Sequence, residues 1–339
     1  MNHKGRYFSI VIPVYNVAPY LRECLDSVLA QTFTNWECLC VNDGSSDDSG
    51  AILDEYAQKD PRFRVWHQKN KGLSAARNKA LENVLGEYFC FLDSDDWVAP
   101  NWLEVFYQGF RQTNADMVRM RWIPFVDEVP LIECSNRYEY SIFSWDDDET
   151  MEHYLRALTR QCYVPICSYR SDRFLKERFS QNNICIEDVP YTFSLVDKCR
   201  TIAQSEYNGY FYRQRHNSLL HQRPNYHLWV AHLKEIERVV HTCEHELLVR
   251  VLLNTTFKNL SIGITYGTRQ QQKTIISILK LLMRKEGIIM SQDKLHWQCA
   301  MWLFIKFNLV WPIKLLRYGF SCKNAIIRLV RSSKAAVNR

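Results

Sequence analysis

A short apolar run at residues 88–92 ends in three carboxylates within four positions, and this abrupt change constrains the fold most strongly. A run this apolar is typical of a strand covered on both faces, as in the parallel sheets of α/β proteins. Ligands of such sheets bind just beyond the carboxyl ends of the strands, where Asp93, Asp95 and Asp96 would emerge. Because neighbouring carboxylates repel one another, the turn indicates a site for a hard cation or, alternatively, a solvated turn that caps the next helix.

The chain before residue 122 alternates between strand-like and helix-like patterns. Apolar, β-rich runs predict strands at residues 8–14, 36–41, 64–66, 88–92 and 117–122. Helical spacing predicts helices that begin at Pro19, near Ile52, after Gly72 and after Asn101, the first with Leu21, Cys24, Leu25, Val28 and Leu29 on its inner face. Such repeated alternation predicts right-handed crossovers and a Rossmann-like α/β fold with a mainly parallel sheet flanked by helices.

Beyond residue 122 the alternation ends. Residues 123–145 predict loops and short strands, and the acidic cluster 146–149 predicts a helix start, because negative charge favours the positive end of the helix dipole. A further strand is expected at 165–169, and a helical pattern runs from Tyr226 to the end of the sequence. The C-terminal part is therefore predicted to be a helical extension.

Composition indicates an ordinary globular chain with an uneven charge. The 339 residues are 47% hydrophobic and 24% charged, which excludes a disordered protein. Residues 226–339 carry 18 Lys/Arg against 6 Asp/Glu, whereas residues 1–225 carry 25 against 31. We therefore separate a region 1–225 from a basic, mostly helical region 226–339.

The twelve cysteines show no metal-ligand spacing. Cys38 and Cys40 form the closest pair and no C-x-x-C occurs, so a zinc site is not expected. The first residues run into a strand with no secretion-signal pattern, and so many thiols fit a reducing cytoplasm. No stretch reaches the ~18 uncharged apolar residues of a spanning helix, since residues 299–316, the nearest candidate, contain Lys306, Pro312 and Lys314.

Six segments, taken in order, resemble the family 2 glycosyltransferases, whose members have the GT-A fold. They are Val11-Ile-Pro-Val-Tyr-Asn16, Asn42-Asp-Gly-Ser-Ser-Asp47, Asn70-x-Gly-Leu-x-x-Ala-Arg-Asn78, Phe91-Leu-Asp-Ser-Asp-Asp-Trp97, Glu187-Asp188 and Tyr212-Arg-Gln-Arg-x-x-Ser218. The resemblance covers residues 8–218 and implies a nucleotide-binding half, 1–116, followed by an acceptor-binding half, 117–225. It favours the cation interpretation of the acidic turn, with Mn²⁺ or Mg²⁺ as cofactor.

The resemblance also implies residues that bind a nucleotide-diphosphate sugar, most simply a UDP-sugar. Implied contacts with the donor are made by Pro13, Tyr15, Asn16, Asp43, Asn70, Gly72, Arg77, Asp93, Ser94, Trp97, Arg213 and Arg215. The residues themselves leave two alternatives open: that Pro13 only ends a strand, and that Asp43-Gly44 is an ordinary turn pair. Arg77 either contacts the nucleotide or forms an ion pair with the acidic turn. Arg213 and Arg215 either bind the phosphates or belong to a solvated hairpin.

In the family the D-x-D pair, here Asp93 and Asp95, meets the ribose and the metal, with Asp95 as the direct ligand. Trp97 would shelter the reacting sugar by ring stacking. Glu187-Asp188 stands where the family places its acid pair, which implies Asp188 as the general base and Glu187 as its support. The alternative is that Asp188 only caps a helix.

The expected activity is that of an inverting glycosyltransferase acting on a saccharide acceptor in bacterial cell-surface polysaccharide, lipopolysaccharide or capsule assembly. A nucleotidylyltransferase is the enzymatic alternative, although it should show a Gly-rich, basic loop that residues 14–16 lack. A catalytically silent sugar-binding or scaffold protein is the alternative from another class. The chain-extruding polymerases of the family are disfavoured, because several spans and a Q-x-x-R-W signature are absent from this sequence.

Residues 295–339 carry eight Lys/Arg and no acid, interleaved with aromatic residues. This pattern is typical of a helix lying on an anionic membrane or, alternatively, of one packed on the catalytic domain with its basic face in water. We therefore expect a cytoplasmic protein, peripheral on the cytoplasmic face of the inner membrane, acting on a lipid-linked saccharide. No nucleic-acid partner is expected, because no binding motif accompanies the charge.

Overall fold

The computed structural model describes residues 7–126, 138–158, 163–182, 186–215, 226–253 and 255–256. By its internal contacts the chain divides into two compact units, Met1–Arg223 and Pro224–Arg339. Each unit is described by itself. The predicted division into nucleotide-binding and acceptor-binding halves stays a prediction.

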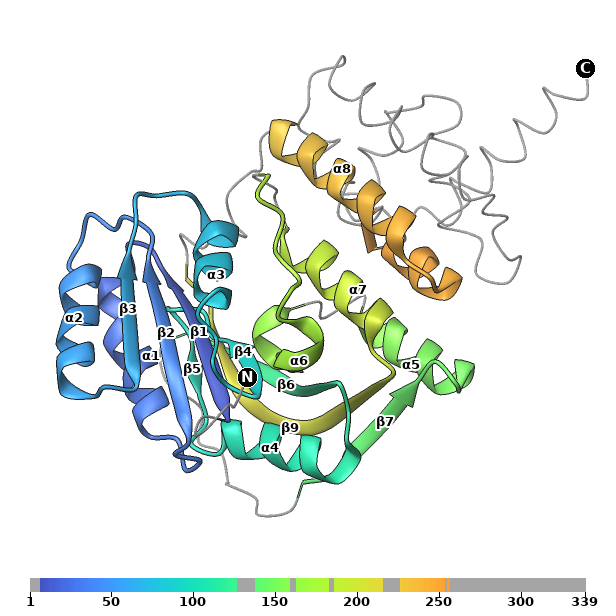
Figure 1. Ribbon diagram of the computed structural model, residues 1–339, viewed down its shortest axis with the longest axis horizontal. Coiled ribbons are helices and arrows are strands. Elements are labelled where there is room, and N and C mark those ends of the chain that lie inside the picture. Colours follow the sequence, from blue (N-terminus) through green and yellow to red (C-terminus); the bar gives the residue numbers. More distant parts are fainter. Residues whose placement is uncertain are drawn as a thin grey trace, which may run out of the picture. The chain divides into compact units, whose positions relative to one another are not determined.

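Within its described residues, the first unit is built on one nine-stranded mixed sheet (Figure 1). The strands, in sheet order, are β3 (Phe63–His67), β2 (Trp36–Asn42), β1 (Phe8–Val14), β4 (Tyr88–Phe91), β8 (Cys167–Arg170), β6 (Met117–Phe125), β9 (Thr201–Arg213) and β5 (Trp97–Val98), with β7 (Tyr140–Ser144) paired to β9. Parallel pairing joins β3, β2, β1 and β4, and also β6 and β9. The remaining pairs are antiparallel.

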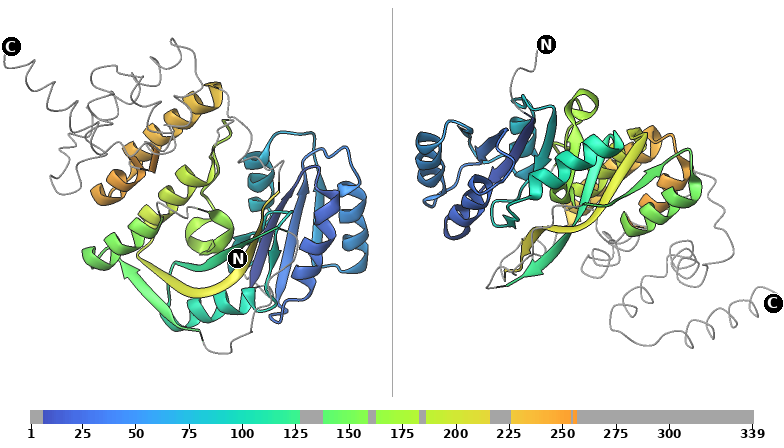
Figure 2. Two further views of the ribbon diagram at one scale, coloured as in Figure 1. Left: turned by 180° about the vertical axis from the view of Figure 1, so that it is seen from behind. Right: turned by 90° about the horizontal axis from the view of Figure 1, so that it is seen from below.

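Helices pack on this sheet. They are α1 (Ala18–Leu29), α2 (Ser49–Lys59), α3 (Leu73–Leu81), α4 (Trp102–Thr113), α5 (Asp148–Leu158), the 3₁₀ turn η1 (Val164–Ile166), α6 (Ser171–Phe174) and α7 (Asp188–Lys198). Figures 1 and 2 show α1 and α2 on one face of the parallel strands and α3 on the other. Because both faces are covered, every residue of β1, β2 and β4 is buried, and the predicted buried strands are confirmed.

The structure corrects several local predictions. Leu29, expected on the inner face of its helix, is the last residue of α1 and is exposed. The strand expected from Pro165 begins only at Cys167, because residues 164–166 form a 3₁₀ turn, where proline's missing N–H costs no sheet hydrogen bond. The strand predicted at 117–122 continues to Phe125 as β6.

In the second unit, α8 (Tyr226–Thr242) buries Trp229, Leu233, Ile236 and Val240, which recur at helical spacing. The helical pattern predicted from Tyr226 is therefore confirmed for this segment. None of the helices that the structure describes is both long and apolar enough to cross a bilayer. The basic segment 295–339 lies outside the described residues, so its predicted membrane contact stays a prediction.

Candidate active site

The loops that follow β1 and β2 are held together at the carboxyl edge of the parallel strands. Asn16, with a φ of 52°, accepts a hydrogen bond from the Ser46 N–H at 2.8 Å and donates its own N–H to Ser45 Oγ at 3.0 Å. Pro13 is buried within β1, whereas Tyr15 is 50% exposed. Among the predicted contacts of this loop, Tyr15 and Asn16 are therefore exposed, whereas Pro13 is not.

Asp43 is a buried acceptor that organises the loop before α3. Its Oδ1 accepts the Lys71 N–H at 2.9 Å, and its Oδ2 accepts the Gly72 N–H at 2.8 Å. Gly44 has a φ of 74°, and a Cβ there would lie 2.8 Å from the Asn70 nitrogen, so only glycine fits this close approach. The Asp43-Gly44 pair is therefore part of a packed junction between two loops. Its predicted nucleotide contact, like those of the neighbouring residues, stays a prediction.

The three carboxylates after β4 have different surroundings. Asp96 is buried and accepts hydrogen bonds from the Tyr210 hydroxyl and, at 2.8 Å, from the Arg213 N–H. Burial raises the pKa of Asp96 well above its usual value and also raises the pKa of Asp95. The side chain of Asp93 is 32% exposed and that of Asp95 18%, so these two are the ones accessible to a ligand. Asp96 instead fixes the turn to β9.

The D-x-D pair fits a cation that arrives with phosphates. Across the described ranges, no three His, Cys, Asp or Glu side chains are grouped as in a protein-only metal site. Mg²⁺ and similar hard cations are commonly held by one or two carboxylates together with substrate phosphates, and Asp93 and Asp95 supply such oxygens. In the structure Arg215 Nε lies 2.6 Å from Asp95 Oδ2 and offsets its charge. Mn²⁺ or Mg²⁺ as cofactor therefore suits the donor set.

Arg77 joins the acidic turn to the predicted acid pair. Its side chain is 1% exposed, and its Nη2 donates to Asp93 Oδ1 at 2.9 Å. Nη1 donates to Asp188 Oδ1 at 2.8 Å and to Glu187 Oε1 at 3.0 Å. The structure thus shows Arg77 in an ion pair with the acidic turn, and its contact with the nucleotide stays a prediction. Asp93 and Glu187, which lie 16 and 110 positions from Arg77 along the chain, thus both contact its guanidinium.

Asp188 is the first residue of α7, and Glu187 precedes the helix without a side-chain capping hydrogen bond. The Asp188 carboxylate accepts instead from Arg77 and, at 3.3 Å, from the Val164 N–H. Burial raises the pKa of Asp188 to about 7, while the charge of Arg77 opposes the shift. A carboxyl group with this pKa exchanges its proton near neutral pH, as general bases do. Its contacts differ from those of a simple N-cap.

The basic pair at the end of β9 is not a solvated hairpin. Arg213 is buried, donates from Nε to the Asp95 carbonyl at 2.9 Å and forms an ion pair with Glu23. Arg215 is partly exposed beside Asp95. Trp97 packs edge-on against Phe211, with ring centroids 4.6 Å apart, in a cluster with other apolar side chains. Contacts of Trp97 with a sugar and of the arginines with phosphates stay predictions.

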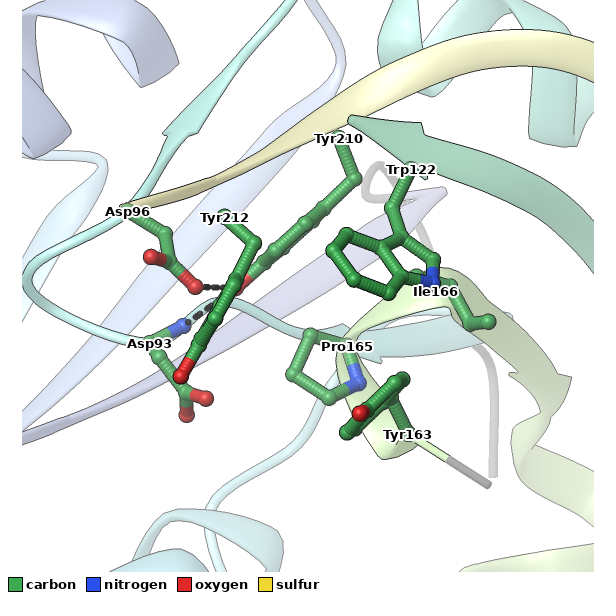
Figure 3. Close-up of a pocket in the computed structure, with 8 residues that line it drawn as sticks. All are labelled: Asp93, Asp96, Trp122, Tyr163, Pro165, Ile166, Tyr210 and Tyr212. Carbon is green, nitrogen blue, oxygen red and sulfur yellow. Dashed lines mark hydrogen bonds between the residues drawn. The ribbon is translucent and has the colours of Figure 1, made fainter. Parts of the chain in front are cut away.

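An aromatic cavity beside Asp93 and Asp96 was not predicted from the sequence (Figure 3). Besides these acids it is lined by Trp122, Tyr163, Pro165, Ile166, Tyr210 and Tyr212. The alternation of Tyr210 and Tyr212 at the end of β9 could have indicated one wall, since alternate residues of a strand share a face. Nothing in the local pattern pairs them with Trp122 or Tyr163, which come from distant segments.

Known proteins resemble this chain in sequence and in fold. A family model described as Glycosyl transferase family 2 matches residues 9–179. The uncharacterized glycosyltransferase EpsJ of Bacillus subtilis is 34% identical over 225 residues, 62% of this chain and 62% of that protein. The putative glycosyltransferase EpsH of Bacillus subtilis is 39% identical over 159 residues, 44% of this chain and 42% of that protein. The chain therefore spans less than two thirds of the length of these curated relatives.

Among solved structures, S. aureus TarS 1–349 in complex with UDP-GlcNAc superimposes with a TM-score of 0.68. The match covers 91% of this chain and 89% of that one, at 16% sequence identity. At this identity the likeness shows the fold. The predicted mixed α/β architecture, with helices on a central sheet, is confirmed by it.

Proposed function

The chain belongs to glycosyl transferase family 2, and on that basis we propose that it is an inverting glycosyltransferase of the hexosyltransferase class. It would move a sugar from a nucleotide-diphosphate donor, a UDP-sugar, to a saccharide acceptor in the assembly of a bacterial surface polysaccharide, lipopolysaccharide or capsule. The observation that carries the proposal is Arg77, which joins Asp93 on the donor side to Asp188 on the acceptor side. The complex of TarS with UDP-GlcNAc supports the choice of donor class.

The proton leaves the acceptor through Asp188. A sugar hydroxyl is a weak nucleophile, so a positioned carboxylate must take its proton as the hydroxyl attacks the anomeric carbon. Arg77 and the Val164 N–H fix both oxygens of the Asp188 carboxylate, which limits its rotation. Glu187, on the same guanidinium, adds negative charge beside Asp188 and thereby favours its protonation. The base is consequently oriented before the acceptor arrives.

Charge on the donor side is balanced by groups near Asp95. When bound, a divalent cation at Asp93 and Asp95 would supply charge neutralisation for the departing nucleoside diphosphate. Arg215 lies beside Asp95 and is partly exposed, so its guanidinium can turn toward a phosphate. Arg213 is buried against the Asp95 carbonyl and holds the turn that carries the D-x-D pair.

Release of UDP tests this proposal. A panel of UDP-sugars is incubated with the protein and Mn²⁺, and at least one is expected to release UDP slowly even without a saccharide acceptor. Asp95→Ala should lower this release about 10²-fold, because the leaving group loses its charge stabilisation. The control is Asp172→Ala, whose side chain is 66% exposed in an ion pair with Arg170. Release unaffected by Asp95→Ala, or sugar binding without any turnover, would count against the transferase.

A further inference from the structure

The aromatic cavity of Figure 3 is small inside and open at its mouth. It encloses about 30 Å³ within a hollow of about 290 Å³ that includes the mouth. The enclosed part holds roughly two water molecules, too little for a sugar ring. A ring that lies across the mouth would direct one substituent inward.

Strand register gathers the aromatic side chains on one face of the sheet. Trp122 of β6 is directly opposite Tyr210 of β9, and Tyr212 is two residues further along β9. These three therefore share a face, whereas Phe211 between the two tyrosines packs into the cluster of Ala99 and Phe125.

The rings of Tyr163 and Tyr212 form one pair of cavity walls, and the Trp122 ring stands nearly perpendicular to both. Those of Tyr163 and Tyr212 are close to parallel, with an interplanar angle of 16° and centroids 6.5 Å apart. Trp122 stands at 84° to Tyr163 and at 85° to Tyr212, with centroid distances of 5.4 and 5.6 Å. Its Nε1–H is buried and has no hydrogen-bond partner among the described residues. A buried donor of this kind calls for an acceptor from a ligand or water.

The same cavity adjoins the reacting groups of the proposed transfer. Asp93 forms part of its lining, which places the cavity next to the donor side. Tyr163 and Pro165 flank Val164, whose N–H donates to Asp188 Oδ2 at 3.3 Å. Tyr163 and Pro165, which line the cavity, are thus the sequence neighbours of the residue whose N–H holds the carboxylate proposed to take the acceptor's proton.

Building on the proposed function, we propose that Trp122, Tyr163 and Tyr212 form the acceptor subsite, which binds the terminal pyranose of the acceptor saccharide by its apolar C–H face. A pyranose presents C–H groups on its faces and hydroxyls at its edge, so stacking on aromatic rings leaves the hydroxyls free to meet Asp188. The subsite selects for ring shape and lies beside the donor side at Asp93.

Saturation-transfer NMR tests the subsite with simple probes. The protein is mixed with UDP, Mn²⁺ and the methyl glycosides of glucose, galactose and mannose, and transfer to ring C–H protons of at least one glycoside is expected. Tyr163→Leu and Tyr212→Leu should each reduce this transfer at least fivefold while the UDP signals persist. Trp66→Leu is the matched control, because Trp66 lies on β3 at the opposite edge of the sheet. Thermal unfolding of each variant verifies that it is folded.

The outcomes separate this inference from the proposed function. UDP signals without transfer to any glycoside, or transfer that both tyrosine variants preserve, would overturn the acceptor subsite and leave the transferase standing. Failure of the wild-type protein to bind UDP in the presence of Mn²⁺ would instead contradict the proposed function. Loss of glycoside signals in Trp66→Leu as well would show that the probes do not report on the cavity, and would also overturn the assignment.

Discussion

Asp188→Asn is expected to lower the kcat for sugar transfer by about 10³-fold, the range for loss of a positioned general base. Asparagine has nearly the same shape as aspartate, and its single amide oxygen can keep the hydrogen bond from Arg77, at the loss of the one from the Val164 N–H. It cannot accept a proton from the acceptor hydroxyl. Because the D-x-D turn is unchanged, UDP affinity should stay within about twofold, a pattern that separates a transition-state role from ground-state binding.

Calorimetry with UDP and Mn²⁺ measures the UDP affinity, and an assay of sugar transfer on the same preparation measures kcat. Asp172→Asn serves as the control, since its exposed carboxylate lies outside the site. Equal losses of UDP affinity and transfer in Asp188→Asn would show that Asp188 belongs to the donor site. An unaffected kcat would show that another group takes the proton.

Arg77→Met is expected to lower the free energy of unfolding by about 3–5 kcal/mol, the usual cost of breaking a buried ion pair from one side. Methionine retains most of the apolar volume but removes the charge that joins Asp93, Glu187 and Asp188. Three carboxylates with side chains 15–32% exposed would then face one another without a cation. Arg77→Lys keeps the positive charge, so its free energy of unfolding should lie between those of Arg77→Met and the wild type.

Urea unfolding of the three proteins measures this effect. Arg22→Met is the matched control, because Arg22 and Glu55 pair at 2.6 Å on the surface, where solvent screens the interaction. Its unfolding midpoint should equal that of the wild type. If Arg77→Met were as stable as Arg22→Met, the three-carboxylate junction would not contribute to the fold.

The parallel half of the sheet could be predicted because its signals are local. The strand at residues 8–14 has the predicted bounds, and those predicted at 36–41 and 88–92 differ by one residue. Each owes its pattern to coverage on both faces, which leaves a continuous apolar run in the sequence. The six family segments then indicated which loops hold the predicted donor-binding and catalytic residues.

The second half could not be predicted in the same way. Strand β9 carries polar residues at several positions and pairs with three other strands, so no single alternation marks it. The two-residue strand β5 is defined only by its pairing with Tyr210 and Phe211. Such pairing depends on segments more than 100 residues away, which a local pattern does not record.

Contacts across the fold also decide what each acid of the site does. The family pattern separates Asp93 and Asp95 from Asp96 in the sequence, but only the contacts with the Tyr210 hydroxyl and the Arg213 N–H show that Asp96 is structural. The ion pairs of Arg77 with Asp93, Glu187 and Asp188 likewise depend on residues far apart in the sequence, while its nucleotide contact stays a prediction. The aromatic cavity was missed because its walls come from β6, β9 and the segment before η1.

The proposed single displacement, with Asp188 as the base on the face opposite the diphosphate, would fix the stereochemistry of the product. The most direct measurement is ¹H NMR of the sugar released when water replaces the acceptor, recorded before mutarotation, with the UDP-α-sugar that releases UDP fastest. We expect the β anomer to appear first. The α anomer as the first product would mean retention, and would contradict a single displacement assisted by Asp188.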